Sequence, residues 1–140
     1  MDLILWRHAD AEDGADDLAR KLTKKGEAQA TMMAAWLRQH LPKDAVLVSS
    51  PAMRAQQTAK ALGLPIITEK SIAPGASPAA ILKAAEKHKG TVVLVGHQPD
   101  FGRAAAQLIA GQDVEWPIAK AGFWWISGKS VRAVLSPDLL

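Results

Sequence analysis

Two histidines stand where apolar stretches of the chain end. Arg7 and His8 come directly after the apolar run at residues 3–6, and His97 follows the β-branched, charge-free run at residues 91–95 by one glycine. An isolated Arg-His pair is typical of a strand that exits to a polar surface, but the recurrence favours a site. In open α/β sheets the ligand crevice lies at the carboxyl ends of the strands. We therefore expect these side chains to meet at one edge of a sheet.

Arg54 completes this set, because it lies in the first turn of the helix expected after a third apolar run, at residues 45–48. Two guanidinium groups, two imidazoles and nearby helix N-termini form a pocket suited to a tetrahedral dianion. One imidazole could attack phosphorus, and the other, protonated, could stabilise the equatorial oxygens. The residue types therefore indicate phosphoryl chemistry.

Metal binding is the main alternative for a histidine pair. His8, Asp10 and His97 could supply three ligands, but Arg7 and Arg54 beside them would repel a cation. No HExxH or similar ligand spacing occurs. We therefore expect no metal.

A serine nucleophile is the second alternative. Ser49 and Ser50 lack the G-x-S-x-G elbow that activates such a serine. Ser50 precedes Pro51, and a serine followed by proline at the first helical position is a good helix start. The expected role of these serines is therefore helix capping.

Strand and helix patterns alternate along the chain. The pattern predicts one domain, residues 1–140, with a three-layer α/β/α sandwich, a mainly parallel sheet and a C-terminal antiparallel hairpin. Strands are expected at residues 3–7, 45–48, 65–68, 91–95, 123–126 and 130–135; helices are expected from a Thr23 cap to Pro42, from Ser50-Pro51 to Gly63, from Ser77-Pro78 to Gly90 and from Pro99 to Gly111.

The composition is that of a globular protein with a basic surface. Hydrophobic residues make up 49% of the chain, and the net charge is +3 although five of the fourteen acids lie within residues 10–17. This balance suits an anionic substrate. The absence of cysteine excludes a thiol nucleophile and a disulfide framework and agrees with a reducing cytoplasm.

We expect no membrane and no nucleic-acid partner. No signal-like segment precedes the first strand, and no apolar run is long enough to cross a bilayer. The tryptophan-rich strand near the C-terminus lacks interleaved basic residues, which makes it a poor nucleic-acid platform. The expected location is the cytoplasm, and the oligomeric state is left open.

Three motifs together resemble the histidine phosphatase superfamily, whose fold is phosphoglycerate mutase-like. Residues 3–9 resemble the family's strand ending in Arg-His-Gly, residues 50–59 its second signature and residues 93–97 its third. The chain length, residues 20–26 and residues 96–99 are most similar to the SixA-type phosphohistidine phosphatases.

This resemblance implies a role for each site residue. His8 would be the nucleophile that becomes phosphorylated, and Arg7, Arg54 and His97 would bind the phosphoryl group. Arg20 would be a substrate-binding neighbour of the pocket. No metal and no other cofactor is implied.

The chain departs from the family pattern in two places. Ala9 replaces the usual glycine beside the nucleophile, and residues 71–77 contain no carboxylate where larger members carry their proton donor. Asp10, Asp16, Asp17 and Asp100 are the remaining donor candidates, and the first three are interpreted as a solvated acidic loop.

The missing donor bears on the substrate. An alkoxide leaves badly without a proton, whereas imidazole, with an ordinary pKa of about 6.5, leaves readily. We therefore expect a metal-independent phosphatase that dephosphorylates a histidine-phosphorylated protein through phosphohistidine on His8, with an acid limb in its rate. The alternatives are a general small-molecule phosphomonoesterase and a non-catalytic phosphate-binding module.

Overall fold

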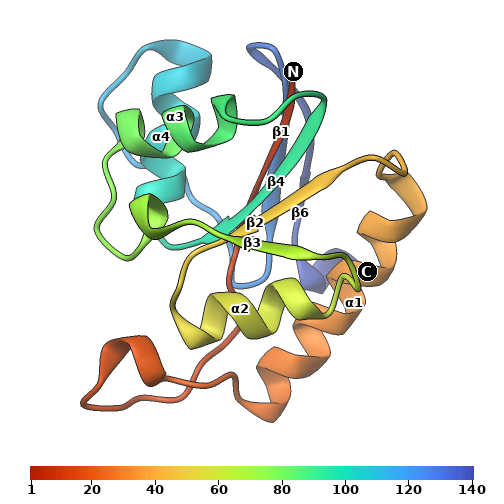
Figure 1. The fold of residues 1–140 in the computed structure, drawn as a ribbon, viewed down its shortest axis with the longest axis vertical. Coiled ribbons are helices and arrows are strands. Elements are labelled where there is room, and N and C mark those ends of the chain that lie inside the picture. Colours follow the sequence, from red (N-terminus) through yellow and green to blue (C-terminus); the bar gives the residue numbers. More distant parts are fainter.

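The computed structural model describes all 140 residues and is built on a six-stranded sheet with the order β3-β2-β4-β1-β5-β6 (Figure 1). Neighbouring strands are parallel from β3 to β1, while β5 runs antiparallel to β1 and β6 antiparallel to β5. The predicted sheet with its C-terminal hairpin is confirmed. The strands are β1 (Asp2–Arg7), β2 (Val46–Ser49), β3 (Ile66–Thr68), β4 (Thr91–Gly96), β5 (Phe123–Ser127) and β6 (Ser130–Leu135).

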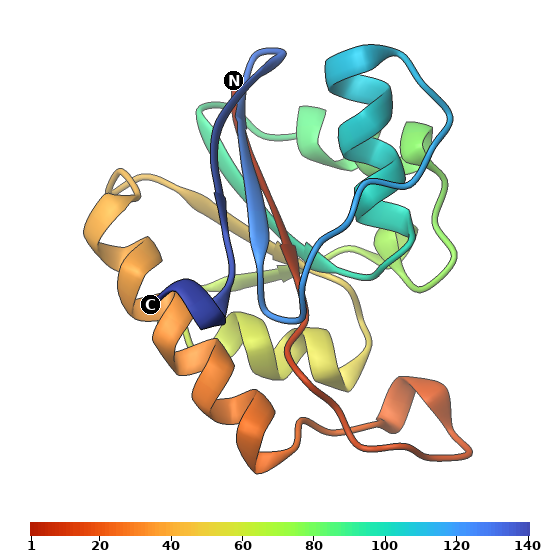
Figure 2. The same cartoon turned by 180° about the vertical axis from the view of Figure 1, so that it is seen from behind.

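Two pairs of helices cover the two faces of the sheet (Figures 1 and 2). Helices α1 (Lys24–His40) and α2 (Met53–Lys60) lie on one face, and α3 (Pro78–Glu86) and α4 (Asp100–Ala110) on the other. This arrangement is the predicted three-layer sandwich. Three short 3₁₀ helices complete the chain: η1 (Asp17–Ala19), η2 (Lys70–Ile72) and η3 (Pro137–Leu139).

The alternation of side chains along β1 divides the core between the two faces. Ile4 and Trp6 pack in the cluster shared with α1 and α2, whereas Leu3 and Leu5 pack in the cluster shared with α3 and α4. This is the period-two alternation of a strand that is buried on both faces. The strand that ends in Arg7 is therefore held from both sides.

Helix starts follow the predicted capping residues at α1 and α3 but not at α2. Thr23 Oγ1 accepts a hydrogen bond from Gly26 N, and Ser77 Oγ accepts one from Ala80 N. Helix α2 begins only at Met53, with no side-chain cap. The prediction that Ser50-Pro51 starts this helix is therefore wrong, and the Ser50 hydroxyl has another environment, described below.

Sheet register brings three strand ends to the same level. Arg7 of β1 lies opposite Gly96 of β4, and Ser49 of β2 lies opposite Val95 of β4. His8 N continues this ladder by donating to Gly96 O over 2.9 Å, and Ser50 N donates to Val95 O over 2.9 Å. The residues that follow these strands therefore meet at the carboxyl edge of the sheet. None of the helices combines the length and the apolar character needed to span a membrane.

Candidate active site

The four residues predicted to do chemistry line one cavity of about 480 Å³ at the carboxyl edge of the sheet. Arg7 and His8 come from the end of β1, Arg54 from the first turn of α2 and His97 from the end of β4. Arg20, from the loop after β1, also lines it. The structure thus brings together every predicted site residue, while their roles remain predictions.

The hydrogen bonds of His8 define its neutral tautomer. Its Nδ1 lies 2.7 Å from Ala9 O, a carbonyl that can only accept, so Nδ1 carries the proton. Its Nε2 accepts a hydrogen bond from Arg54 Nε at 3.3 Å. Burial, with the nearby arginine charges adding to it, lowers the pKa of His8 to about 4. At neutral pH, Nε2 therefore carries a lone pair, as a nucleophile requires.

Arg54 is buried and has a partner that the sequence analysis missed. Its Nη1 donates to Asp17 O over 2.6 Å, and its Nη2 donates to Asp17 Oδ2 over 3.2 Å. Arg20 Nη1 also donates to the Asp17 carboxylate. The bonds from Arg20 and Arg54 hold the pKa of Asp17 below its ordinary value. Asp17 is exposed, as the interpretation of a solvated loop expects, but its hydrogen bonds to Arg54 were not predicted. The acidic composition of residues 10–17 does not indicate that one of these carboxylates contacts Arg54 at the strand-end site.

Arg7 has spare hydrogen-bonding capacity at the cavity. Its Nη1 donates to Ile118 O over 2.9 Å, while its Nε is buried without a partner. An unpaired buried donor is costly unless a ligand satisfies it. This donor therefore suits an anion bound beside His8.

His97 faces His8 across the site. The centroids of the two rings are 5.3 Å apart. The His97 Nε2 lies 2.8 Å from Ser50 Oγ, while its Nδ1 is buried without a partner. Burial and the neighbouring charges lower the pKa of His97 to about 3. His97 is therefore neutral in the free protein, and the protonated second imidazole expected beside a bound phosphoryl group stays a prediction.

Asp10 belongs to the junction between the loop and α1. Its carboxylate accepts hydrogen bonds from Lys120 Nζ and Thr23 Oγ1, each at 2.7 Å. No group of three histidine and acidic side chains is placed to hold a metal ion. The ligand set of His8, Asp10 and His97 considered from the sequence is therefore not assembled.

Asp100 is the one carboxylate among the lining residues of the cavity. It is 6% exposed, and its Oδ2 accepts a hydrogen bond from Gly75 N at 2.8 Å. Burial raises the pKa of Asp100. Asp100 thus reaches from α4 to the loop in which larger family members carry their acid.

Ala9 fits the site with ordinary backbone geometry. Its φ is not positive, its side chain is buried, and its N–H donates to Thr58 Oγ1 over 3.0 Å. Since no left-handed conformation is needed here, the methyl group imposes no backbone strain. The replacement of glycine therefore adds no positive-φ strain beside His8.

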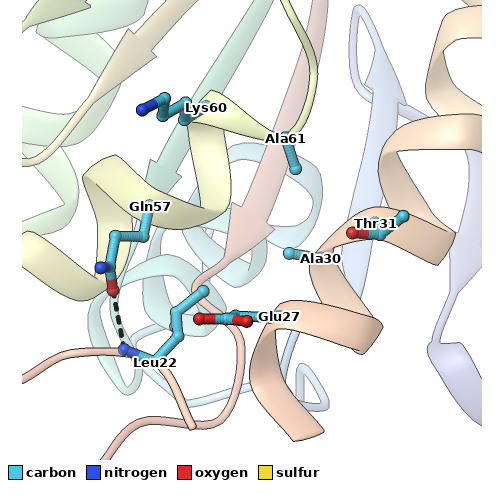
Figure 3. A pocket seen from close by; sticks show the side chains of 7 residues that line it. All are labelled: Leu22, Glu27, Ala30, Thr31, Gln57, Lys60 and Ala61. Atoms are coloured by element: carbon cyan, nitrogen blue, oxygen red, sulfur yellow. Dashed lines mark hydrogen bonds between the residues drawn. The ribbon is translucent and has the colours of Figure 1, made fainter. Parts of the chain in front are cut away.

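A second cavity, of about 300 Å³, lies between α1 and α2 (Figure 3). Gln57 Oε1 accepts a hydrogen bond from Leu22 N at 2.8 Å and ties the end of the loop to α2. Glu27 and Lys60 are its charged lining residues, and it contains neither arginine nor histidine. It therefore lacks the donors of the strand-end cavity.

Comparisons with known proteins agree with the fold and the motifs. The family model of the histidine phosphatase superfamily (branch 1) matches residues 3–73. The phosphohistidine phosphatase SixA of Escherichia coli is 32% identical, with 80% of this chain and 76% of that protein covered. A SixA homolog of Haemophilus influenzae is also 32% identical, with 93% and 92% covered.

Solved structures show the same architecture. A SixA structure in complex with tungstate has a TM-score of 0.86 at 24% identity and covers 99% of both chains, which shows the fold. A SixA-like protein of Nakamurella multipartitia has a TM-score of 0.86 at 27% identity, with 97% of this chain and 95% of that chain covered. With the motifs, the fold and these relatives in agreement, the chain belongs to the histidine phosphatase superfamily and is of the SixA type.

Proposed function

We propose that this hydrolase is a phosphohistidine phosphatase that removes the phosphoryl group from a histidine-phosphorylated protein through a covalent intermediate on His8. The observation that carries the proposal is the tautomer of His8. Its Nδ1–H is held by the Ala9 carbonyl and its Nε2 lone pair lies beside Arg54 in the cavity. The relatives named phosphohistidine phosphatases support the choice of substrate class.

In the first step, His8 Nε2 forms a bond to phosphorus while the bond from phosphorus to the substrate nitrogen breaks. The substrate imidazole takes the electron pair and a proton from solvent, and His8 keeps its proton on Nδ1. Arg7, Arg54 and His97 surround the transferring group and stabilise its charge. No strong acid is needed, because imidazole is a good leaving group.

In the second step, water attacks phosphorus and the bond from phosphorus to His8 Nε2 breaks. Inorganic phosphate leaves, and the neutral His8 is restored with its lone pair on Nε2. The cationic side chains that held the phosphoryl group in the first step hold it again here. Both steps use only groups that line the cavity, water and solvent protons.

The test is hydrolysis of a phosphohistidine-bearing protein beside p-nitrophenyl phosphate, with a chelator present, for the wild type and His8→Ala. We expect chelator-resistant loss of protein phosphohistidine that disappears in His8→Ala. His88→Ala, a histidine outside the cavity, is the matched control and should behave like the wild type. Activity that requires a metal, or that survives in His8→Ala, would overturn the proposal.

A general phosphomonoesterase is the second candidate, and Asp100 is the observation that favours it. This buried carboxylate with a raised pKa lines the cavity and could protonate an ester oxygen. Asp100→Asn separates the two functions. An esterase would lose ester turnover in this variant, whereas a phosphohistidine phosphatase would keep its activity on phosphohistidine.

A phosphate-binding module without catalysis is the third possibility that the sequence left open. The unstrained Ala9 and the unprotonated Nε2 of His8 favour an enzyme instead. Tight binding of inorganic phosphate without turnover of either substrate would indicate the module.

A further inference from the structure

We propose that Ser50 is a positioning residue whose hydroxyl donates to His97 Nε2 and thereby places the imidazole proton on Nδ1, so that neutral His97 donates a hydrogen bond to the phosphoryl group. The role in phosphoryl binding rests on the proposed function. The position of the His97 proton can be observed in the free protein without turnover.

The hydrogen bonds around Ser50 determine the direction of donation. Ser50 Oγ accepts a hydrogen bond from Ala52 N at 3.2 Å and lies 2.8 Å from His97 Nε2. Ser50 is fully buried, and its hydroxyl proton has no other acceptor. If Nε2 carried the proton and donated it, the hydroxyl proton would be left unpaired in a closed environment, which is costly. Donation from Ser50 to Nε2 pairs both the hydroxyl proton and Nε2, and leaves only Nδ1 of His97 without a protein partner.

Donation in this direction leaves the single proton of neutral His97 on Nδ1. The Nδ1 atom is buried without a protein partner, and the His97 side chain lines the cavity. With Nδ1 as the atom that meets the phosphoryl group, the opposite tautomer would present a lone pair to an anion, which is repulsive. The Ser50 hydroxyl thus turns a neutral imidazole into a donor at this position.

The two histidines of the site are therefore oriented by partners of different chemistry. The Ala9 carbonyl can only accept, so it holds the proton of His8 on Nδ1 and leaves the lone pair on Nε2, to which Arg54 Nε donates. The Ser50 hydroxyl accepts from Ala52 N–H, and its own proton has only His97 Nε2 as an acceptor, so it donates to His97. One imidazole becomes a nucleophile and the other a hydrogen-bond donor, although both are neutral.

The backbone holds Ser50 in place for this task. Ser50 N donates to Val95 O over 2.9 Å, which continues the pairing of β2 with β4. Ser50 O accepts hydrogen bonds from Ser49 Oγ and Gln56 Nε2, each at 2.9 Å. Ser50 does not line the cavity, so it acts through His97 and does not touch the phosphoryl group.

The deciding measurement is the tautomer of His97, read from long-range ¹H–¹⁵N correlation spectra of the free protein and of the protein saturated with inorganic phosphate. In the wild type we expect the proton on Nδ1 and a bare Nε2. Ser50→Ala should abolish this preference, and Ser50→Thr, which keeps the hydroxyl, should retain it.

Ser49→Ala is the matched control, since Ser49 is equally buried but donates to Ser50 O and does not contact His97. It should keep the wild-type tautomer. Ser50→Ala should weaken phosphate binding and slow phosphoryl transfer by about tenfold, less than the 10²–10³ expected on deleting a donor outright. Ser49→Ala should change neither quantity beyond about twofold if only the hydroxyl on His97 matters.

A proton on Nε2 of His97 in the wild type would overturn the inference, and so would equal tautomers and phosphate affinities in Ser50→Ala and Ser49→Ala. If Ser50→Ala does not fold, the wild-type spectrum and Ser50→Thr still decide. A correct tautomer in a protein without phosphohistidine phosphatase activity would contradict the proposed function and leave this inference standing.

Discussion

The carboxyl edge of the sheet and the acidic loop after β1 both contribute to the cavity, but they hold their residues in different ways. Arg7 is the last residue of β1, and His8 and His97 directly follow β1 and β4. The register of these two paired strands therefore fixes where the three residues lie. Arg20 and Asp17 lie in the loop, where they form an ion pair with each other, and Asp17 also pairs with the buried Arg54. The strand-end residues are thus fixed by backbone pairing, whereas the loop residues depend on side-chain contacts.

The largest expected effect is a difference in rate between two arginine substitutions, one at the edge of the sheet and one in the acidic loop. Arg7→Ala removes a buried donor beside His8 and should lower the rate by about 10²–10³. Arg20→Ala removes a half-buried side chain whose ion pair with the exposed Asp17 is screened by solvent, and should cost less than about tenfold. The rate constant of dephosphorylation measures both. Equal losses in the two variants would show that the loop arginine contributes as much to the rate as the strand-end arginine.

The next effect is the pH at which the nucleophile becomes protonated. Burial lowers the pKa of His8 to about 4, so Nε2 keeps its lone pair at neutral pH and loses it as the pH falls through about 4. A histidine-selective NMR titration should show the His8 ring neutral at pH 6. The rate on an acid-stable aryl phosphate should fall only near this midpoint. A midpoint near 6.5, the ordinary value, would show that the sheet edge is not desolvated as described.

The smallest effect belongs to the loop. Asp17→Asn removes a negative charge from Arg54, yet the bond from Arg54 Nη1 to Asp17 O remains. Because the Asp17 side chain is 55% exposed, its ion pair contributes little. Inorganic phosphate should bind about two- to fivefold tighter in this variant, as measured by calorimetry. Weaker binding would show that Asp17 positions Arg54 for the ligand and does not compete with it.

Most of the fold and the four central side chains could be predicted from the sequence because they depend on local patterns. Apolar runs predicted the strands, Thr23 and Ser77 predicted helix starts, and the residues after two strands predicted the edge of the sheet. Such signals are contained in short segments, so they need no knowledge of how the chain folds back on itself.

The parts of the site that were missed depend on contacts between distant segments. The sequence around Asp17 is acidic and polar, and nothing in it indicates that the loop returns to Arg54, 37 positions away. The Ser50-Pro51 pair predicts a helix cap, yet the Ser50 hydroxyl lies against His97, which the pairing of β2 with β4 brings close. The protonation of His97 could not be predicted either, since burial decides it.

The most direct test of the central role of His8 is to trap the phosphorylated protein. Brief reaction with a phosphohistidine-bearing protein, followed by quenching at alkaline pH and peptide mass spectrometry, locates the phosphoryl group, and ³¹P NMR identifies the nitrogen that carries it. We expect the group on Nε2 of His8 and no phosphopeptide from His8→Ala. A phosphoryl group on His97, or full turnover in His8→Ala, would contradict the assignment of His8 as the nucleophile.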